Sequence, residues 1–144
     1  MNWKLLAACL LLWPLEAQAV ELHYIHVVKG TQGLSHVPVT VRNTGITPIS
    51  CTIQLAHWYS VGLGEALPGA HTDIDLWFDK ASGTYLVLND IEDNMPVEAV
   101  WCGIAGRAFA TRMELPLDRS KGAAPEPELM RCTAGTDRLA CTKG

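Results

Sequence analysis

Cysteines are the residues in this sequence with the most readily interpreted chemistry. Four of the five lie beyond residue 19, at Cys51, Cys102, Cys132 and Cys141. If the chain is exported, this even number predicts two disulfides. The first two cysteines lie among apolar residues and the last two lie close together in a polar segment, which favours the pairs Cys51–Cys102 and Cys132–Cys141. A zinc site is the alternative, but the chain has no Cys-x-x-Cys pair.

Histidines offer a second possible chemistry, which is metal binding. The candidate ligands are His23, His26, His36 and His57, if the fold brings them together. His23 and His26 are three residues apart, which places them on one face of a helix but on opposite faces of a strand. Because their neighbours predict a strand, we expect no resident cofactor. A small metal-binding protein is therefore the alternative to the function favoured below.

Acidic side chains between residues 73 and 93 could supply oxygen ligands to calcium, but they lack the D-x-D-x-D-G spacing of a calcium loop. We favour a solvated acidic edge that protects an exposed strand from aggregation. The sequence also has no Gly-x-Ser-x-Gly elbow, no Ser-x-x-Lys and no phosphate-binding glycine loop. A hydrolase whose catalytic residues meet only in the folded chain is a third hypothesis.

Aromatic residues give the strongest indication of function. Trp58 and Tyr59 end the predicted strand 49–59, whereas Trp77 and Trp101 alternate with the inward-facing residues of their own strands. This phase predicts outward-facing indoles, and large exposed aromatic side chains often mark contact surfaces. The alternative is that a loop and the C-terminal segment cover them. We therefore favour a non-catalytic protein that binds a protein partner in an accessory or recognition role.

Residues 1–19 have the layout of a secretory signal peptide. Lys4 supplies a positive charge, residues 5–12 are apolar, and Ala17-Gln18-Ala19 is a small-x-small cleavage site. The apolar run is too short to span a bilayer. We expect cleavage near Ala19 and a secreted or periplasmic chain without a membrane span. The net charge of −4 and the scattered basic residues argue against nucleic-acid binding.

Short strands separated by turns are predicted for the rest of the chain. Segment 49–59 begins with Ile49, Cys51, Ile53 and Leu55 in alternation with polar residues, which predicts a half-buried strand. Loops are predicted over 60–70 and 89–96. The other predicted strands span 22–28, 37–41, 73–78, 84–88, 97–104 and 107–115. This pattern predicts an all-β fold, an antiparallel two-sheet sandwich.

The stretch VPVTVRNTG followed by PISCTIQL resembles the strand–turn–strand unit of many bacterial immunoglobulin-like sandwiches. The spacing of Cys51 and Cys102 is compatible with the bridge between sheets in such folds, although Val100 stands where antibody domains have a tyrosine. We predict one β-sandwich domain over residues 20–116. Residues 117–144 are predicted to be a flexible polar tail that ends in a small disulfide loop.

Overall fold

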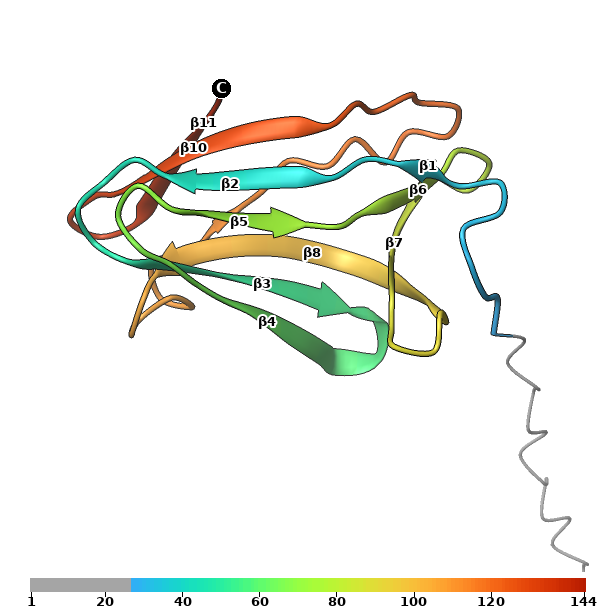
Figure 1. Cartoon of the computed structure of the whole chain (residues 1–144), viewed down its shortest axis with the longest axis horizontal. Helices are drawn as coiled ribbons and strands as arrows, with labels where there is room; N and C mark the ends of the chain where they lie inside the picture. Colours follow the sequence, from blue (N-terminus) through green and yellow to red (C-terminus); the bar gives the residue numbers. More distant parts are fainter. Residues whose placement is uncertain (1–26) are drawn as a thin grey trace, which may run out of the picture.

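A computed structural model describes residues 27–144 of the chain (Figure 1). These residues form an all-β structure of two sheets, which confirms the predicted fold class at that level. Within this part of the chain, no helix has the length and apolar character needed to cross a membrane. The predicted signal peptide and most of the predicted strand 22–28 lie outside the described residues.

The larger sheet has seven strands, and six of them follow the order β1-β6-β7-β8-β3-β4. The seventh, β9, pairs with β8. The 11-residue strand β8 pairs first with β7 and then with β3, and so it joins the two halves of the sheet. The strands are β1 (Ser35–His36), β3 (Ile49–Leu55), β4 (Tyr59–Ala66), β6 (Trp77–Asp79), β7 (Thr84–Leu88), β8 (Asn94–Ile104) and β9 (Met113–Glu114).

The smaller sheet has the order β11-β10-β2-β5. Strand β10 runs parallel to β2, whereas the other two pairs are antiparallel. The predicted sandwich is therefore mixed rather than wholly antiparallel. The strands of this sheet are β2 (Val39–Asn43), β5 (His71–Ile74), β10 (Glu128–Ala134) and β11 (Leu139–Lys143).

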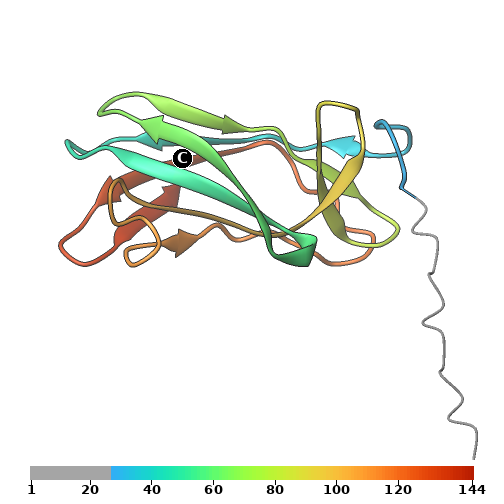
Figure 2. The same ribbon diagram turned by 90° about the horizontal axis from the view of Figure 1, so that it is seen from below.

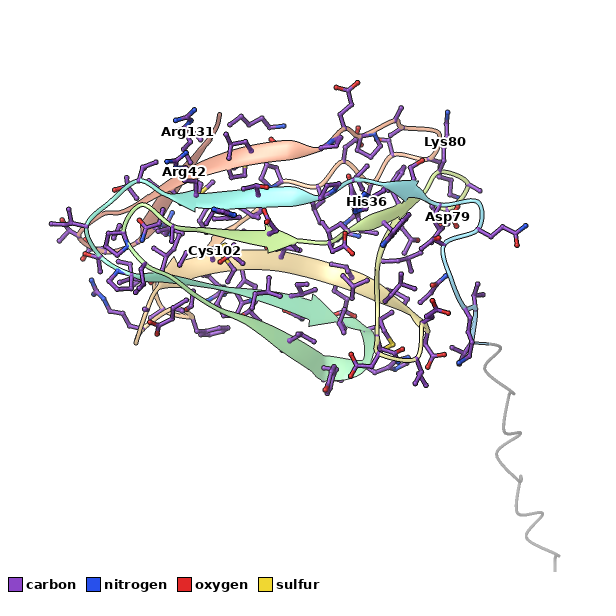
Figure 3. All side chains as sticks on the ribbon, viewed as in Figure 1. His36, Arg42, Asp79, Lys80, Cys102 and Arg131 are labelled. Carbon is purple, nitrogen blue, oxygen red and sulfur yellow. A yellow bond between two sulfur atoms is a disulfide. The ribbon has the colours of Figure 1, made fainter. Side chains whose placement is uncertain are left out.

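Two segments of chain cross from one sheet to the other. The first segment is β1 and β2, which are separated by two residues, and the second is β5 and β6, also separated by two residues. The two segments pair with each other in both sheets, β1 with β6 and β2 with β5. His36 and Arg42 mark the two ends of the first segment (Figure 3). Pro38 lies at its crossing, where a residue without an amide hydrogen interrupts no ladder. The predicted single strand 73–78 is thus two strands in different sheets.

Both predicted disulfides are present. Cys51 in β3 lies opposite Cys102 in β8 with 4.0 Å between Cα atoms, and Cys132 in β10 lies opposite Cys141 in β11 at 4.1 Å. Each bridge joins neighbouring strands of one sheet, so the expected bridge between the two sheets is wrong. Hydrogen bonding between the two strands already places the two thiols opposite each other. Each disulfide therefore fixes the register of a strand pair and does not link the two sheets.

The C-terminal segment differs most from prediction. The flexible tail expected over 117–144 is wrong for its second half, because β10 and β11 complete the smaller sheet. Met130, Cys132 and Leu139 are each at most 2% exposed and belong to the core. The alternation of apolar and polar residues in β10 is short and follows a proline-rich stretch, so composition obscured it.

Two other predicted elements are also different. The loop expected over 60–70 contains most of β4, and the strand expected over 107–115 contains only β9. The irregular segment before β9 is held by buried Thr111, whose hydroxyl accepts a hydrogen bond from Ile104 N (2.8 Å) and donates one to Arg107 O (3.0 Å). This segment packs so closely on β8 that a Cβ at Gly103 would lie 2.0 Å from Ala108 O.

A buried asparagine joins the turns at one end of the sandwich. Asn43 is 0% exposed, and its Nδ2 donates to Thr47 O and Ala66 O, both at 2.9 Å. Its Oδ1 accepts from Gly45 N at 3.0 Å, and its backbone N donates to Ala70 O at 2.9 Å. Asn43 therefore ties the end of β4 and the start of β5 to the β2–β3 turn. We call this set of contacts the Asn43 node.

Replacing Asn43 with alanine is expected to lower the free energy of unfolding by roughly 2–4 kcal/mol, because the buried carbonyl of Ala66, the half-buried carbonyl of Thr47 and the amide of Gly45 lose their partner. Urea unfolding followed by tryptophan fluorescence measures this loss. Asn89→Ala is the matched control, since the Asn89 side chain also accepts backbone hydrogen bonds but does so in an exposed loop. Equal losses in both variants would contradict the role assigned to Asn43.

Candidate functional site

Strands β4 and β5 are the edge strands of their sheets, and each pairs with a neighbour on one side only. The turn between them is fixed by the Asn43 node. The two strands diverge with distance from that turn. The far end of β4 lies at the β3–β4 turn, and the far end of β5 lies next to β6 (Figures 1 and 2). The two sheets are therefore closed at one end of this side and open at the other.

A cavity of about 610 Å³ occupies this wedge, and we call it the β4–β5 groove. Its apolar lining comes from β3, β4, β7 and β8, namely Ile53, Leu55, Val61, Leu63, Val87, Leu88 and Met95. The remaining lining residues are Tyr59, Asn89 and three aspartates, Asp73, Asp75 and Asp90. Ile53 and Leu55 also belong to the main core, so the groove opens onto the interior of the sandwich.

Strand β4 carries little of the protection that is usual for an exposed sheet edge. Edge strands are commonly guarded by charged side chains or proline, whereas the only charged residue of β4 is Glu65. Ser60, Gly62 and Gly64 alternate with the groove residues of this strand. Gly64 has a φ of +78°, near an irregularity in the pairing with β3. Before this point, the β4 edge carries no charged residue and no proline.

The loop between β7 and β8 forms one wall of the groove, and its own hydrogen bonds define its conformation. Asn89 Oδ1 accepts hydrogen bonds from Ile91 N (3.0 Å) and Asp93 N (2.8 Å), and Lys29 Nζ lies 2.9 Å from Asp93 Oδ1. Hydrogen bonds from Lys29 and then from Asn89 hold the pKa of the Asp93 carboxyl below its ordinary value. The loop leaves Asp90 and Ile91 exposed beside the groove.

The predicted strand 49–59 ends at Leu55, and the turn η1 (Ala56–Trp58) joins β3 to β4 and displays an aromatic side chain next to the groove. His57 and Trp58 have φ values of 64° and 66°, in the left-handed region that costs most residues roughly 1–2 kcal/mol each. Trp58 is 96% exposed, so its packing does not offset this strain. Tyr59 follows directly and lines the groove. Strained backbone of this kind is often retained for function.

The four aromatic residues predicted to contact a partner lie in three separate places. Only Trp58 and Tyr59 are at the groove. Half-buried Trp77 stacks on His36 with 4.6 Å between ring centroids, and half-buried Trp101 meets Phe109 edge-on at 6.0 Å. Neighbouring side chains therefore partly cover two of the four indole and phenol groups.

The predicted metal ligands are also dispersed. His23 and His26 lie outside the described residues, His36 contacts Asp75, and His57 lies in the η1 turn. Between residues 27 and 144, no three histidine, cysteine or acidic side chains meet in a group that could hold a metal ion. Metal binding by this chain stays a prediction without structural support.

Sequence patterns did not reveal the apolar part of the site. Val61 and Leu63 lie in β4, Val87 lies in β7 and Met95 lies in β8. Both β4 and the start of β8 fall in segments that were predicted to be loops, 60–70 and 89–96. The alternation of Val61 and Leu63 with small residues was a weak strand signal. However, these residues line one groove only because of the order of strands in each sheet, and no local sequence pattern encodes that order.

Comparison with known proteins found no protein-family model, no curated protein and no solved structure that matches this chain. Any statement of function therefore rests on the groove and its surroundings.

Replacing His57-Trp58 with Asn-Gly is expected to raise the free energy of unfolding by about 1–2 kcal/mol, because these residues accept positive φ in a tight hairpin turn. Urea unfolding of the disulfide-bonded protein measures the change. Trp58→Phe is the control, because it keeps the strained backbone and should leave stability within about 0.5 kcal/mol. A double variant that is less stable than the parent would contradict the assignment of strain to this turn.

Proposed function

We propose that this protein is an exported, non-catalytic binding protein that takes up an extended segment of a partner polypeptide. The segment adds as a further strand to the free edge of β4, and its alternate side chains enter the β4–β5 groove. The observation that carries this proposal is the coincidence of an unguarded sheet edge with an apolar groove along the same strand.

Strand addition supplies the two interactions that this site lacks. Backbone hydrogen bonds from the added strand would pair the free edge of β4, while alternate side chains would cover the apolar groove. Part of the groove lining, including Val61 and Leu63, is only half-buried. Trp58 and Tyr59 stand at the β3–β4 turn, where exposed aromatic side chains could anchor the incoming segment.

Export is part of the same proposal. The predicted signal peptide over residues 1–19 supports it, and the two disulfides are compatible with an extracellular or periplasmic location. The immunoglobulin-like relationship suggested by the sequence is kept as a proposal about architecture. A two-sheet all-β fold supports it only broadly, and both disulfides lie within single sheets.

A blocked, dye-labelled peptide with the sequence Gln-Thr-Val-Thr-Val-Thr-Val-Thr-Gln serves as the probe, because its alternate valines suit one face of a strand. We expect saturable binding in fluorescence anisotropy, to the chain that begins at residue 20. A peptide with proline in place of the central valine should bind at least about tenfold more weakly, since proline cannot complete the ladder. Equal binding of the two peptides would contradict strand addition.

Substitutions on two sheet edges locate the binding site. Leu63→Arg places a long charged side chain in the groove and should weaken binding of the valine peptide by about tenfold or more. Thr142→Arg is the matched control, because Thr142 is exposed on β11, an edge strand of the smaller sheet, and does not line the groove. The Asn-Gly variant of the η1 turn provides a second test that misfolding cannot explain. It should be more stable yet bind more weakly, and unchanged binding in both Leu63→Arg and the Asn-Gly variant would place the site elsewhere.

A further inference from the structure

The charged residues of the β4–β5 groove are all of one sign. Its lining includes Asp73, Asp75 and Asp90 and contains no lysine, arginine or histidine. The first two come from the β5 side, whereas Asp90 lies on the β7–β8 loop. The apolar lining instead comes largely from β3 and β4. A ligand that pairs with β4 would therefore meet hydrocarbon along the groove and carboxylates along the opposite rim.

Among residues 27–144, no lysine or arginine forms an ion pair with these three carboxylates. Asp73 accepts a hydrogen bond from Thr40 (2.6 Å) and lies 3.5 Å from His71 Nε2, while Asp75 contacts His36. Asp90 makes no side-chain hydrogen bond or ion pair with another of residues 27–144. The nearby cation Lys29 is already engaged by Asp93. The rim of the groove therefore keeps a negative potential toward an incoming ligand.

We infer that the partner segment is a cationic, apolar strand, with lysine or arginine among the alternate positions that face the groove. This inference rests on the proposed function and specifies the partner's chemistry. A long basic side chain can lay its methylene stem along Val61 and Leu63 and place its charge beside Asp73, Asp75 or Asp90. An acidic segment of the same shape would be repelled at that rim.

Three blocked peptides that share the pattern X-Thr-Val-Thr-Val-Thr-Val-Thr-X, with X as lysine, glutamine or glutamate, test this chemistry. In about 50 mM salt, the lysine peptide should bind roughly tenfold more tightly than the glutamate peptide, with the glutamine peptide between them. The spread should shrink at about 500 mM salt because exposed charges are screened. Equal affinities of the three peptides would overturn the inference and leave the proposed function standing.

Substituting the three aspartates tests whether the groove causes the preference for the lysine peptide. Asp90→Asn should weaken binding of the lysine peptide about threefold without changing that of the glutamine peptide. The triple variant Asp73→Asn, Asp75→Asn and Asp90→Asn should remove the preference. Asp137→Asn, on the exposed β10–β11 turn, is the control and should change neither. A lysine preference that survives the triple variant would overturn the inference.

Two other possible occupants of the groove are tested with the same protein. A peptide of residues 20–28 that binds more tightly than the lysine peptide would assign the groove to the chain's own N-terminal segment and overturn the inference. Light scattering that detects a dimer at the assay concentration would assign it to a second copy, with the same consequence. Failure of every peptide to bind would remove the proposed function as well.

Discussion

The buried amide of Asn43 is the contact on which the shape of the candidate site depends. It bonds the end of β4 and the β2–β3 turn, while the backbone of the same residue holds the start of β5. Buried polar groups of this kind are costly to leave without partners, so the three segments are kept together at one point. From that point β4 follows the larger sheet and β5 follows the smaller one (Figure 2). Because the two sheets diverge, the groove is a geometric consequence of the node.

Under the proposed function, the features around the groove serve binding at the expense of the stability of the free chain. His57 and Trp58 adopt backbone conformations that asparagine and glycine would occupy with less strain, and the indole that they display is almost wholly exposed. Strand β4 likewise leaves an edge open that most proteins would cover or charge. Each feature is unfavourable in the free protein. In the proposed complex, the added strand pairs the open edge and contacts the exposed indole, and the carboxylates of the rim favour a cationic segment.

The sequence predicted those parts of the fold that local patterns encode. The alternation of Ile49, Cys51, Ile53 and Leu55 predicted β3, and the two kinds of cysteine environment predicted both disulfides. Sheet membership was not predictable in this way, because Cys51 and Cys102 would show the same alternation whether they faced each other across two sheets or lay side by side in one. Glycines concealed β4, and proline-rich flanking sequence concealed β10. Trp58 and Tyr59 were predicted as contact residues, but the groove beside them requires knowledge of strand order.

Hydrogen exchange of individual backbone amides in β4 tests the central claim most directly. In the free chain beginning at residue 20, the β4 amides that do not bond to β3 should exchange rapidly, since no strand covers that edge. Saturation with the lysine peptide should slow their exchange by at least about tenfold, whereas amides of β10 and β11 should be unaffected. Free-edge amides of β4 that are already protected without peptide, or that gain no protection with it, would contradict the account of an open edge that receives a strand.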